Sequence, residues 1–383
     1  MAVALAVELA DELVDGAKGA ALPLISHDLG MSYRQIGLLA SVPLLVGGVL
    51  ELPLGLLAGA GRRRRLAVLG GGIVFILSLL AVAGARSFIV LLAAFTIFYP
   101  ASGAFVSLTQ AELMEAWPER QAQVMARWDL AGSTGAVAGP LLLTAVLAAG
   151  SGWRAAYLAL AALAAVAWLG TCLREPRPVR AAADGEPEPD VGFSARARDV
   201  LAALRHWSTV RWALAAVVAD LLVDVLTGFL ALYLVDVVHL APPVAALAVA
   251  IRLGSGLAGD AALVFVLDRV ADVTVLRASA AAAALLYPGF LLAPGPAAKL
   301  VILAVLSAAT APWYPLLQAR LYGSLPGRSP VAVTLSSAAG LAGGLGPLAV
   351  GLLAEAFGLS WALGVLVVVP VAVLAATAGG YRR

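Results

Sequence analysis

The stretch that decides the fold is Ala10-Asp11-Glu12-Leu13-Val14-Asp15, which recurs 209 residues later as Ala219-Asp220-Leu221-Leu222-Val223-Asp224. Two of its acidic positions align in pairs, Asp11 with Asp220 and Asp15 with Asp224, and the same offset pairs Glu51 with Asp260 farther along. Chance is a poor explanation for three acidic matches at one spacing. We therefore predict that the chain is built from two homologous halves.

The repeat continues through the remainder of each half, with the offset falling to 208 and then 207 residues. The later matches are Gln110 with Gln318, Pro118 with Pro326, Trp153 with Trp361, and Gly139-Pro140 with Gly346-Pro347. The repeated unit therefore spans all six apolar segments of each half.

Composition places most of the chain in lipid. Hydrophobic residues make up 62% of the 383 residues and charged residues only 13%, a balance that soluble globular proteins do not show. A spanning helix needs about 20 mainly apolar residues, so the chain has room for about twelve spans and no separate soluble domain. The expected spans are 3–26, 35–58, 66–84, 88–112, 124–148, 154–173, 209–236, 244–266, 273–293, 298–321, 331–355 and 360–379.

The first apolar segment is expected to be a retained span, because its acidic residues and Lys18 would not be tolerated in the core of a secretory signal. The single cysteine, Cys172, excludes a disulfide and a cysteine-based metal site within the chain. Three histidines, His27, His206 and His239, fall near span ends or in the central connection, where solvated histidines are common. We assign none of them a role.

The basic residues predict the orientation of the spans. Nineteen of the 25 Lys and Arg residues fall at one set of span ends, in particular at Arg62–Arg65 and in the stretch 174–211. The opposite loops hold only Arg34, Arg86, Arg154 and Lys299. By the positive-inside rule, both termini are expected to be cytoplasmic in a multi-pass protein of the inner or plasma membrane. The Arg62–Arg65 run is read as a topology determinant, with contact to anionic lipid as the alternative and nucleic acid not expected.

Proline, glycine and acidic residues fill the connection between the halves, which therefore reads as a flexible linker. We predict an N-terminal six-helix bundle at 1–173, a cytoplasmic linker at 174–208 and a C-terminal six-helix bundle at 209–383. An even number of spans in each repeat gives both halves the same orientation, related by an axis along the membrane normal. The expected fold class is an all-α polytopic membrane protein of 12 transmembrane helices arranged as two pseudo-symmetric bundles.

By its span count, central linker and repeat, the chain resembles the major facilitator superfamily over essentially its whole length. Gly55–Arg65 looks like the glycine-rich acidic-basic signature of that family, although Gly59 stands where an aspartate is usual, and Asp268-Arg269 keeps the pair in the second half. Gly135-Ala136-Val137-Ala138-Gly139-Pro140 is similar to the core of the family's antiporter motif. Small residues there allow close helix packing, and ordinary packing explains them equally well. Conformational roles are expected at Gly135, Gly139, Pro140, Gly346, Pro347, Asp268 and Arg269.

Ionisable residues in mid-membrane are the first functional candidates, since each costs about 2.5–3.5 kcal/mol on insertion scales and normally faces a wet cavity or a partner. Glu8, Asp11, Glu12 and Asp15 follow one another at helical spacing and form an acidic stripe. Lys18, three residues beyond Asp15, can neutralise that end of it. Crowded carboxylates at low dielectric favour a bound proton near neutral pH. The expected proton- or cation-coupling residues are Asp11, Asp15, Glu51, Asp220, Asp224 and Asp260.

The resemblance implies that the first, fourth, seventh and tenth spans line a central cavity. Polar and aromatic residues expected to face it are Ser102, Gln110, Thr227, Trp313, Tyr314 and Gln318. Aromatic rings there suit cation–π recognition of an organic cation. The alternative for Trp313 and Tyr314, which stand between Pro312 and Pro315, is that they pack and shape a kinked helix. The span 88–112 lacks the buried arginine that is common in proton-linked members.

These observations predict a secondary active transporter and not an enzyme, working by alternating access on a small-molecule substrate. The leading hypothesis is an antiporter that couples proton movement to efflux of a neutral or cationic small molecule. Uptake of a cationic solute or metal ion is an alternative, since carboxylates are ligands for hard cations. A non-transporting receptor or assembly factor on the same scaffold is a further alternative. We expect a monomer with no cofactor and no resident metal.

Overall fold

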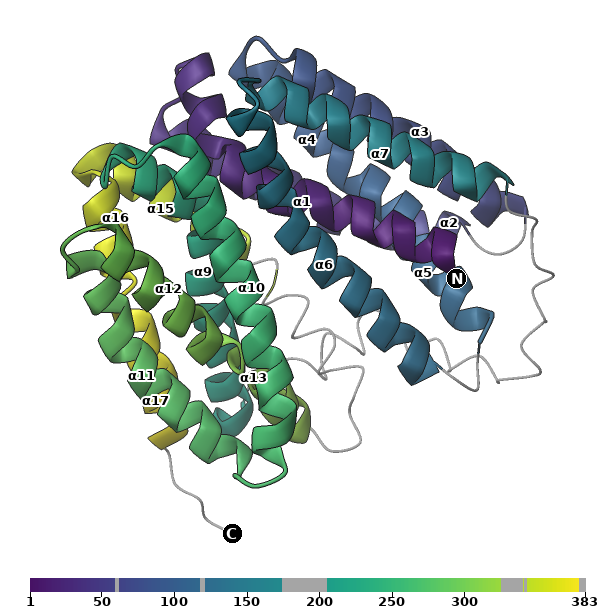
Figure 1. Cartoon of the computed structure of the whole chain (residues 1–383). Coiled ribbons are helices and arrows are strands. Elements are labelled where there is room, and N and C mark those ends of the chain that lie inside the picture. The colour runs from purple at the N-terminus through teal and green to yellow at the C-terminus, as the bar shows by residue number, and fades with distance from the viewer. Residues whose placement is uncertain (59–61, 118–120, 174–204, 325–339, 341–342, 379–383) are drawn as a thin grey trace. The chain divides into compact units, whose positions relative to one another are not determined.

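The computed structural model describes residues 1–58, 62–117, 121–173, 205–324, 340 and 343–378 (Figure 1). All regular structure in these segments is helical. The described residues form two compact units: one takes those of Met1–Ala183 and Thr227–Leu253, the other those of Asp184–Leu226 and Gly254–Arg383. The predicted division at 173 and 208 stays a prediction, and most of the predicted linker lies outside the described residues.

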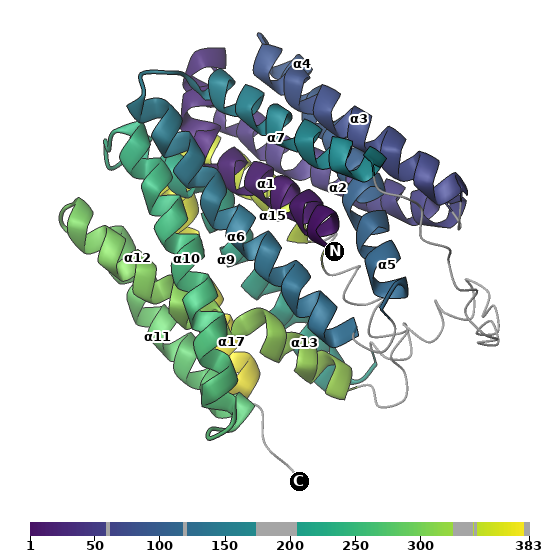
Figure 2. The ribbon, with the colours of Figure 1, turned by 45° about the vertical axis from the view of Figure 1, so that its right-hand side comes forward.

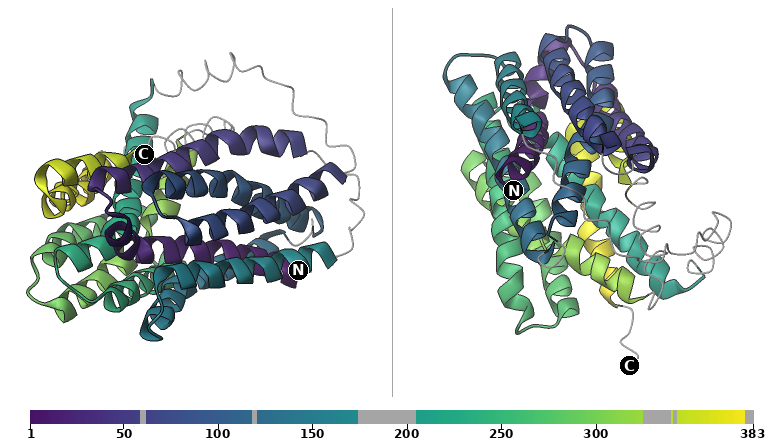
Figure 3. Two further views of the ribbon diagram at one scale, coloured as in Figure 1. Left: turned by 90° about the horizontal axis from the view of Figure 1, so that it is seen from above. Right: turned by 90° about the vertical axis from the view of Figure 1, so that its right-hand side faces the viewer.

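The first unit is a bundle of long helices lying lengthwise beside one another (Figure 3). Helix α1 packs on α6 and α7, and α3 packs on α4 and α7 (Figure 2). The elements are α1 (Ala2–Leu29), α2 (Tyr33–Ala58), α3 (Arg62–Gly84), α4 (Phe88–Ser102), the π-helix η1 (Gly103–Ser107), α5 (Leu108–Glu115), α6 (Gln121–Ala148) and α7 (Trp153–Leu173).

Two helices belong to both units. Helix α9 (Trp207–Asp236) begins in the second unit and ends in the first, whereas α10 (Pro242–Leu267) begins in the first and ends in the second. Within the second unit, α11 packs on α12 and α17. The remaining elements are α11 (Asp272–Leu292), α12 (Pro296–Thr310), α13 (Trp313–Gly323), α15 (Gly346–Phe357), α16 (Leu359–Val365) and α17 (Val368–Ala378).

The expected membrane spans are confirmed as helices where the structure describes them. Ten stretches of the described chain are long and apolar enough to cross a bilayer, and α15 is a shorter apolar helix. Helix α1, with its acidic stripe, covers the first expected span, 3–26, but is not among these ten stretches. The expected span 331–355 falls on α15 where it is described, and 360–379 falls on α16 and α17. The all-α multi-span architecture therefore agrees with the sequence.

Proline interrupts the fourth and the tenth expected spans. Pro100 has no N–H to donate to the preceding turn, and the span that starts with α4 continues after Ser102 as the π-helix η1 and then as α5. In the second half, α12 ends at Thr310 and α13 begins at Trp313, on either side of Pro312. A π-helical turn changes which face of a helix points to its neighbours and often occurs at functional sites.

Glycines bring α6 into backbone contact with α1. A Cβ atom at Gly16 would stand 2.1 Å from the carbonyl oxygen of Ala136, and one at Gly139 would stand 2.3 Å from that of Leu13. A Cβ atom at Gly135 would lie 2.5 Å from the carbonyl oxygen of Leu9. Only the absence of a side chain allows this approach, which is how small residues work at helix interfaces in membranes. The glycines of the Gly135–Pro140 motif therefore pack on the helix that bears the acidic stripe.

The same arrangement returns within the second unit. Gly346, at the start of α15, lies against α9, where an added Cβ atom would stand 2.2 Å from Cδ1 of Leu221. Leu221 directly follows Asp220 in the repeat of the acidic stretch. In each half, a Gly-Pro pair thus packs next to the acidic helix of that half.

Candidate functional site

The carboxylates of α1 differ sharply in their surroundings. Glu8 is only 9% exposed, and Asp11 and Glu12 are half-buried. The side chain of Asp15, one turn farther on, is 54% exposed. The first three carboxylates of the stripe, which look alike in the sequence, are therefore shielded from solvent, whereas the fourth is exposed to it.

Asp11 is held by the last residue of α4. The Ser102 hydroxyl donates a hydrogen bond of 2.8 Å to Oδ1 of Asp11. Ser102 directly precedes the π-helical turn η1, so the break in the fourth span presents this hydroxyl to α1. The structure thus brings together two residues that the sequence placed in the coupling and cavity sets.

Glu8 and Glu12 lie against a glycine face of α6. A Cβ atom at Gly132 would stand 2.7 Å from Oε1 of Glu8, and one at Gly135 would stand 3.0 Å from Cβ of Glu12. The indole of Trp128 and the carboxylate of Asp129, both on α6, are close enough to Glu8 to act on its charge. Sequence reasoning left Glu8, Glu12 and Trp128 out of the site. The sequence feature that could have predicted this contact is Gly132, which lies three residues before Gly135 and so on the same face of α6.

Lys18 sits at the open end of the stripe, in an aromatic setting. Its Nζ donates a hydrogen bond of 2.6 Å to the Tyr99 hydroxyl and lies 3.8 Å from Oδ1 of Asp15. The ammonium also stands 4.8 Å from the ring centroid of Tyr99 and 5.7 Å from that of Phe95. Lys18 therefore compensates the charge of Asp15, and the shielded carboxylates Glu8, Asp11 and Glu12 remain the acidic part of the stripe.

We expect Tyr99→Phe to lower the free energy of unfolding by about 1–2 kcal/mol, because the half-buried Lys18 ammonium loses one of its acceptors but keeps Asp15 and both ring faces. Thermal unfolding of the purified protein in detergent measures this. Tyr314→Phe is the matched control, since the Tyr314 side chain is 63% exposed. An equal loss in both variants would contradict the assignment.

The second acidic pair lies on α9. Asp220 is half-buried and Asp224 is exposed. Because the two carboxylates lie one turn apart on the same face of α9, their charges repel each other. Thr227 follows on the same helix and is half-buried. In both halves the first aspartate of the pair is therefore half-buried and the second is exposed, since Asp11 and Asp15 differ in the same way.

The remaining acidic candidates are Glu51, Asp260 and Asp268. The Glu51 side chain lies outside the described residues, although its position falls in α2. Asp260 is exposed on α10, where the preceding Gly259 packs against the carbonyl oxygen of Ala308. Asp268 and Arg269 are both exposed at the end of α10, and the Arg269 guanidinium donates to the carbonyl oxygen of Phe265, 3.4 Å away.

The predicted cavity residues separate into two groups. Trp313 is 1% exposed and donates a 3.0 Å hydrogen bond from Nε1 to the Ser279 hydroxyl on α11, which favours its packing role. Tyr314, next to it, is exposed, and Gln318 is half-buried. On α5, the Gln110 side chain donates to the sulfur of Met125 at 3.5 Å.

Two of the four arginines that follow α2 bind other helices. The Arg64 guanidinium forms a 2.7 Å ion pair with Glu115 at the end of α5, and Arg65 donates to the carbonyl oxygen of Cys172 at the end of α7. In the second unit, Asp272 at the start of α11 pairs with Arg320 on α13. Asp272 lies 208 residues after Arg64, but Arg320 lies 205 residues after Glu115, so this second ion pair has its charges exchanged and only one of its two positions follows the repeat.

The family model of the Major Facilitator Superfamily matches residues 13–334. The chain belongs to the major facilitator superfamily. It is accordingly a multi-pass membrane transporter for small-molecule substrates and not an enzyme, as the sequence predicted. The membrane that holds it and the side of its termini stay predictions. No curated protein matches the sequence.

Solved structures of transporters share this fold. A mutant form of the nucleoside transporter NupG matches with a TM-score of 0.79 and 13% identity, covering 98% of both chains. A bacterial homologue of the human lysosomal transporter Spinster, inward-facing and occupied, matches with a TM-score of 0.76 and 17% identity over 98% of this chain and 94% of that one. A D-xylose–proton symporter matches with a TM-score of 0.72 and 13% identity over 98% and 95%. At these identities the likeness concerns the fold.

Proposed function

We propose that this transporter is a proton-coupled exporter of neutral or cationic small molecules that works by alternating access. The observation that carries the proposal is the shielded set Glu8, Asp11 and Glu12 on α1, with Asp11 bound by Ser102. Carboxylates inside a membrane are costly and are kept where they carry protons or bind cations. Because they stand within about one helical turn of each other, they favour binding of a proton that neutralises part of their charge.

The charge of the α1 region supports a neutral or cationic substrate. Lys18 is compensated by Asp15, so the shielded carboxylates give the stripe a net negative charge. Anionic solutes would be repelled there. Among the described residues no group of three or more His, Cys, Asp or Glu side chains is arranged to hold a metal ion, and we therefore propose no metal as substrate.

Separate observations support proton coupling and the direction of substrate transport. One structure with the same fold is a proton symporter, so this architecture is compatible with proton coupling. The export direction rests on the similarity of Gly135–Pro140 to the antiporter motif. In this chain the motif lies directly against the acidic helix, so that any proton-dependent shift of α1 is transmitted to α6.

Proteoliposomes with a pH-sensitive dye inside test the proposal. An antiporter takes up substrate when the lumen is acidic, because outward proton flow drives inward substrate flow, whereas a symporter needs an acidic exterior. We expect an acidic lumen to drive uptake of organic cations or neutral solutes, with the lumen becoming more alkaline. Uptake driven only by an acidic exterior would overturn export. Uptake that ignores both gradients would overturn coupling.

A further inference from the structure

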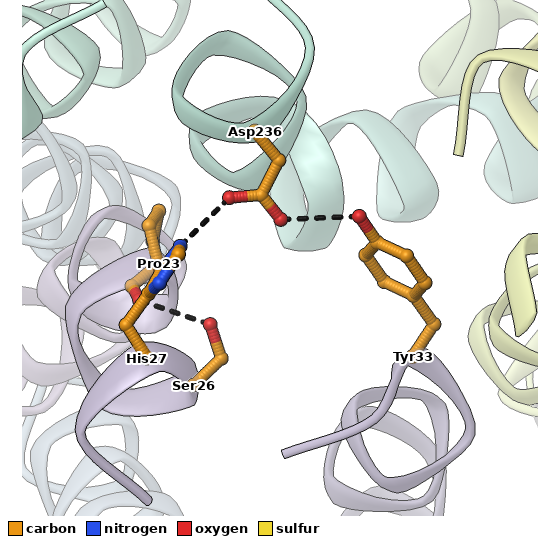
Figure 4. Close-up of polar contacts among 5 residues, drawn as sticks. All are labelled: Pro23, Ser26, His27, Tyr33 and Asp236. Atoms are coloured by element: carbon orange, nitrogen blue, oxygen red, sulfur yellow. Dashed lines mark hydrogen bonds and ion pairs between the residues drawn. The ribbon is translucent and has the colours of Figure 1, made fainter. Parts of the chain in front are cut away.

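Two residues at helix ends, His27 and Tyr33, contact the carboxylate of Asp236 at the end of a third helix (Figure 4). Nε2 of His27, near the end of α1, lies 2.9 Å from Oδ1 of Asp236, the last residue of α9. The hydroxyl of Tyr33, the first residue of α2, donates a 3.1 Å hydrogen bond to Oδ2 of the same carboxylate. The His27 side chain is 65% exposed and that of Asp236 is 19% exposed. We name His27, Tyr33 and Asp236 the outer latch.

The latch joins positions of α1 and α9 that are equivalent in the repeat. Asp236 lies 209 residues after His27. Two turns earlier, a Cβ atom at Gly19 would stand 2.6 Å from the carbonyl oxygen of Thr227, which lies 208 residues after Gly19. Helices α1 and α9 therefore approach each other at Gly19 and Thr227 and again at the latch, about 12 Å farther along α1 at 1.5 Å per residue.

Both contacts lie on one side of the shielded carboxylates along α1. Asp11 precedes Gly19 by eight residues, so the Gly19 contact lies between Asp11 and the helix ends that bear the latch. Those ends are opposite the Arg62–Arg65 run, the side expected to be outside the cell.

We propose that the outer latch is a proton-responsive gate, which keeps α9 on α1 and α2 and releases it more readily as the outer pH rises. Histidine changes charge between pH 5 and 8. When protonated, His27 forms an ion pair with Asp236; when neutral, it offers a single weaker hydrogen bond. Outer acidity thus holds the outer side closed. The gate rests on the contacts of α1 and α9 and not on the solute, the coupling ion or the direction proposed above.

Other charged groups near the latch are few in the described residues. Asp28, next to His27 on α1, is paired at 2.5 Å with Arg154 at the start of α7. Arg34 follows Tyr33 on α2, His239 lies in the turn after α9, and Arg86 lies in the turn between α3 and α4. The Ser26 hydroxyl, seen beside His27 in Figure 4, donates to the carbonyl oxygen of Pro23 within α1. Asp236 is the carboxylate that contacts His27.

Labelling of a cysteine behind the latch tests the gate. The chain's one cysteine is removed as Cys172→Ser and a reporter is introduced as Thr227→Cys, then a membrane-impermeant thiol reagent is added from the outer side. Each rate is divided by that of the same protein carrying His27→Gln at the same pH, which cancels the pH dependence of the thiol itself. We expect the ratio to rise about tenfold from pH 5.5 to 8, the size expected for losing the charge on one hydrogen bond.

Matched variants separate the gate from general effects. His206→Gln removes a histidine outside the latch and should leave the pH dependence unchanged, whereas Asp236→Asn should raise labelling and remove the pH dependence. A ratio that stays flat from about pH 5.5 to 8, the range in which histidine titrates, would overturn the proposal.

Cross-linking provides a readout that does not depend on labelling. In the Cys172→Ser background, a bifunctional thiol reagent with a reducible bond that joins a His27→Cys/Asp236→Cys pair should stop transport, and reduction should restore it, which also shows that the variant is folded. Unchanged transport by the cross-linked protein would contradict a gate at this position.

Discussion

An Asp11→Asn variant is expected to fold and to bind substrate but to lose proton-coupled transport by about 100-fold, the lower end of what a positioned proton-transfer group contributes. Asparagine has nearly the same shape and keeps an oxygen that can accept the 2.8 Å hydrogen bond from Ser102. What it loses is the ability to take up and release a proton. Because Glu8 and Glu12 remain beside it, the loss isolates the contribution of Asp11 alone.

The measurement is gradient-driven uptake into proteoliposomes, alongside substrate exchange with no gradient. Exchange needs alternating access but no net proton movement, so it should survive in Asp11→Asn. Asp15→Asn is the matched control: its side chain is 54% exposed and lies beside Lys18, so we expect a loss of less than about tenfold. Full proton coupling in Asp11→Asn, or equal losses in both variants, would remove Asp11 from the coupling set.

A Gly139→Ala variant is expected to lose about 3 kcal/mol or more of stability, at the upper end of overpacking effects. The added Cβ atom would stand 2.3 Å from the carbonyl oxygen of Leu13 and 2.7 Å from the backbone nitrogen of Ala17. Neither atom belongs to a side chain that can rotate away, so α1 and α6 must separate. Thermal unfolding and the yield of monodisperse protein in detergent should both fall.

Gly70→Ala is the control for this change, since nothing lies within 4 Å of the Cβ position at Gly70 in α3. Alanine is the better helix former by about 1 kcal/mol, so this variant should be as stable as the parent or slightly more so. If Gly139→Ala unfolded at the same temperature as Gly70→Ala, α1 and α6 would not be in backbone contact.

Most of the fold was predictable because lipid leaves the backbone few choices. A segment in the bilayer must satisfy its own N–H and C=O groups, and long apolar runs therefore become helices. The run 209–236 became α9 almost residue for residue. The interruption of the fourth span by η1 was not foreseen, because Pro100 predicts a bend but does not specify a π-helical turn.

The acidic residues of the candidate site could be predicted from the sequence, but the residues that bind them could not. Helical spacing was enough to place Glu8, Asp11, Glu12 and Asp15 along one helix. It did not show that Ser102 binds Asp11 or that Tyr99 binds Lys18, because these contacts join positions 91 and 81 residues apart. His27 was assigned no role, since a histidine near a span end is commonly solvated. Its partner Asp236 lies 209 residues away.

The sequence by itself determined that this chain crosses the membrane many times, that it repeats, and that the repeat carries paired acidic positions. Those conclusions need only composition and spacing, which act locally along a helix. Tertiary structure alone decided which carboxylates are shielded, that Lys18 compensates Asp15, and that Asp236 joins α9 to α1 and α2. Burial and hydrogen bonding depend on which helices approach each other, and glycines such as Gly16 and Gly139 set that approach only once two backbones meet.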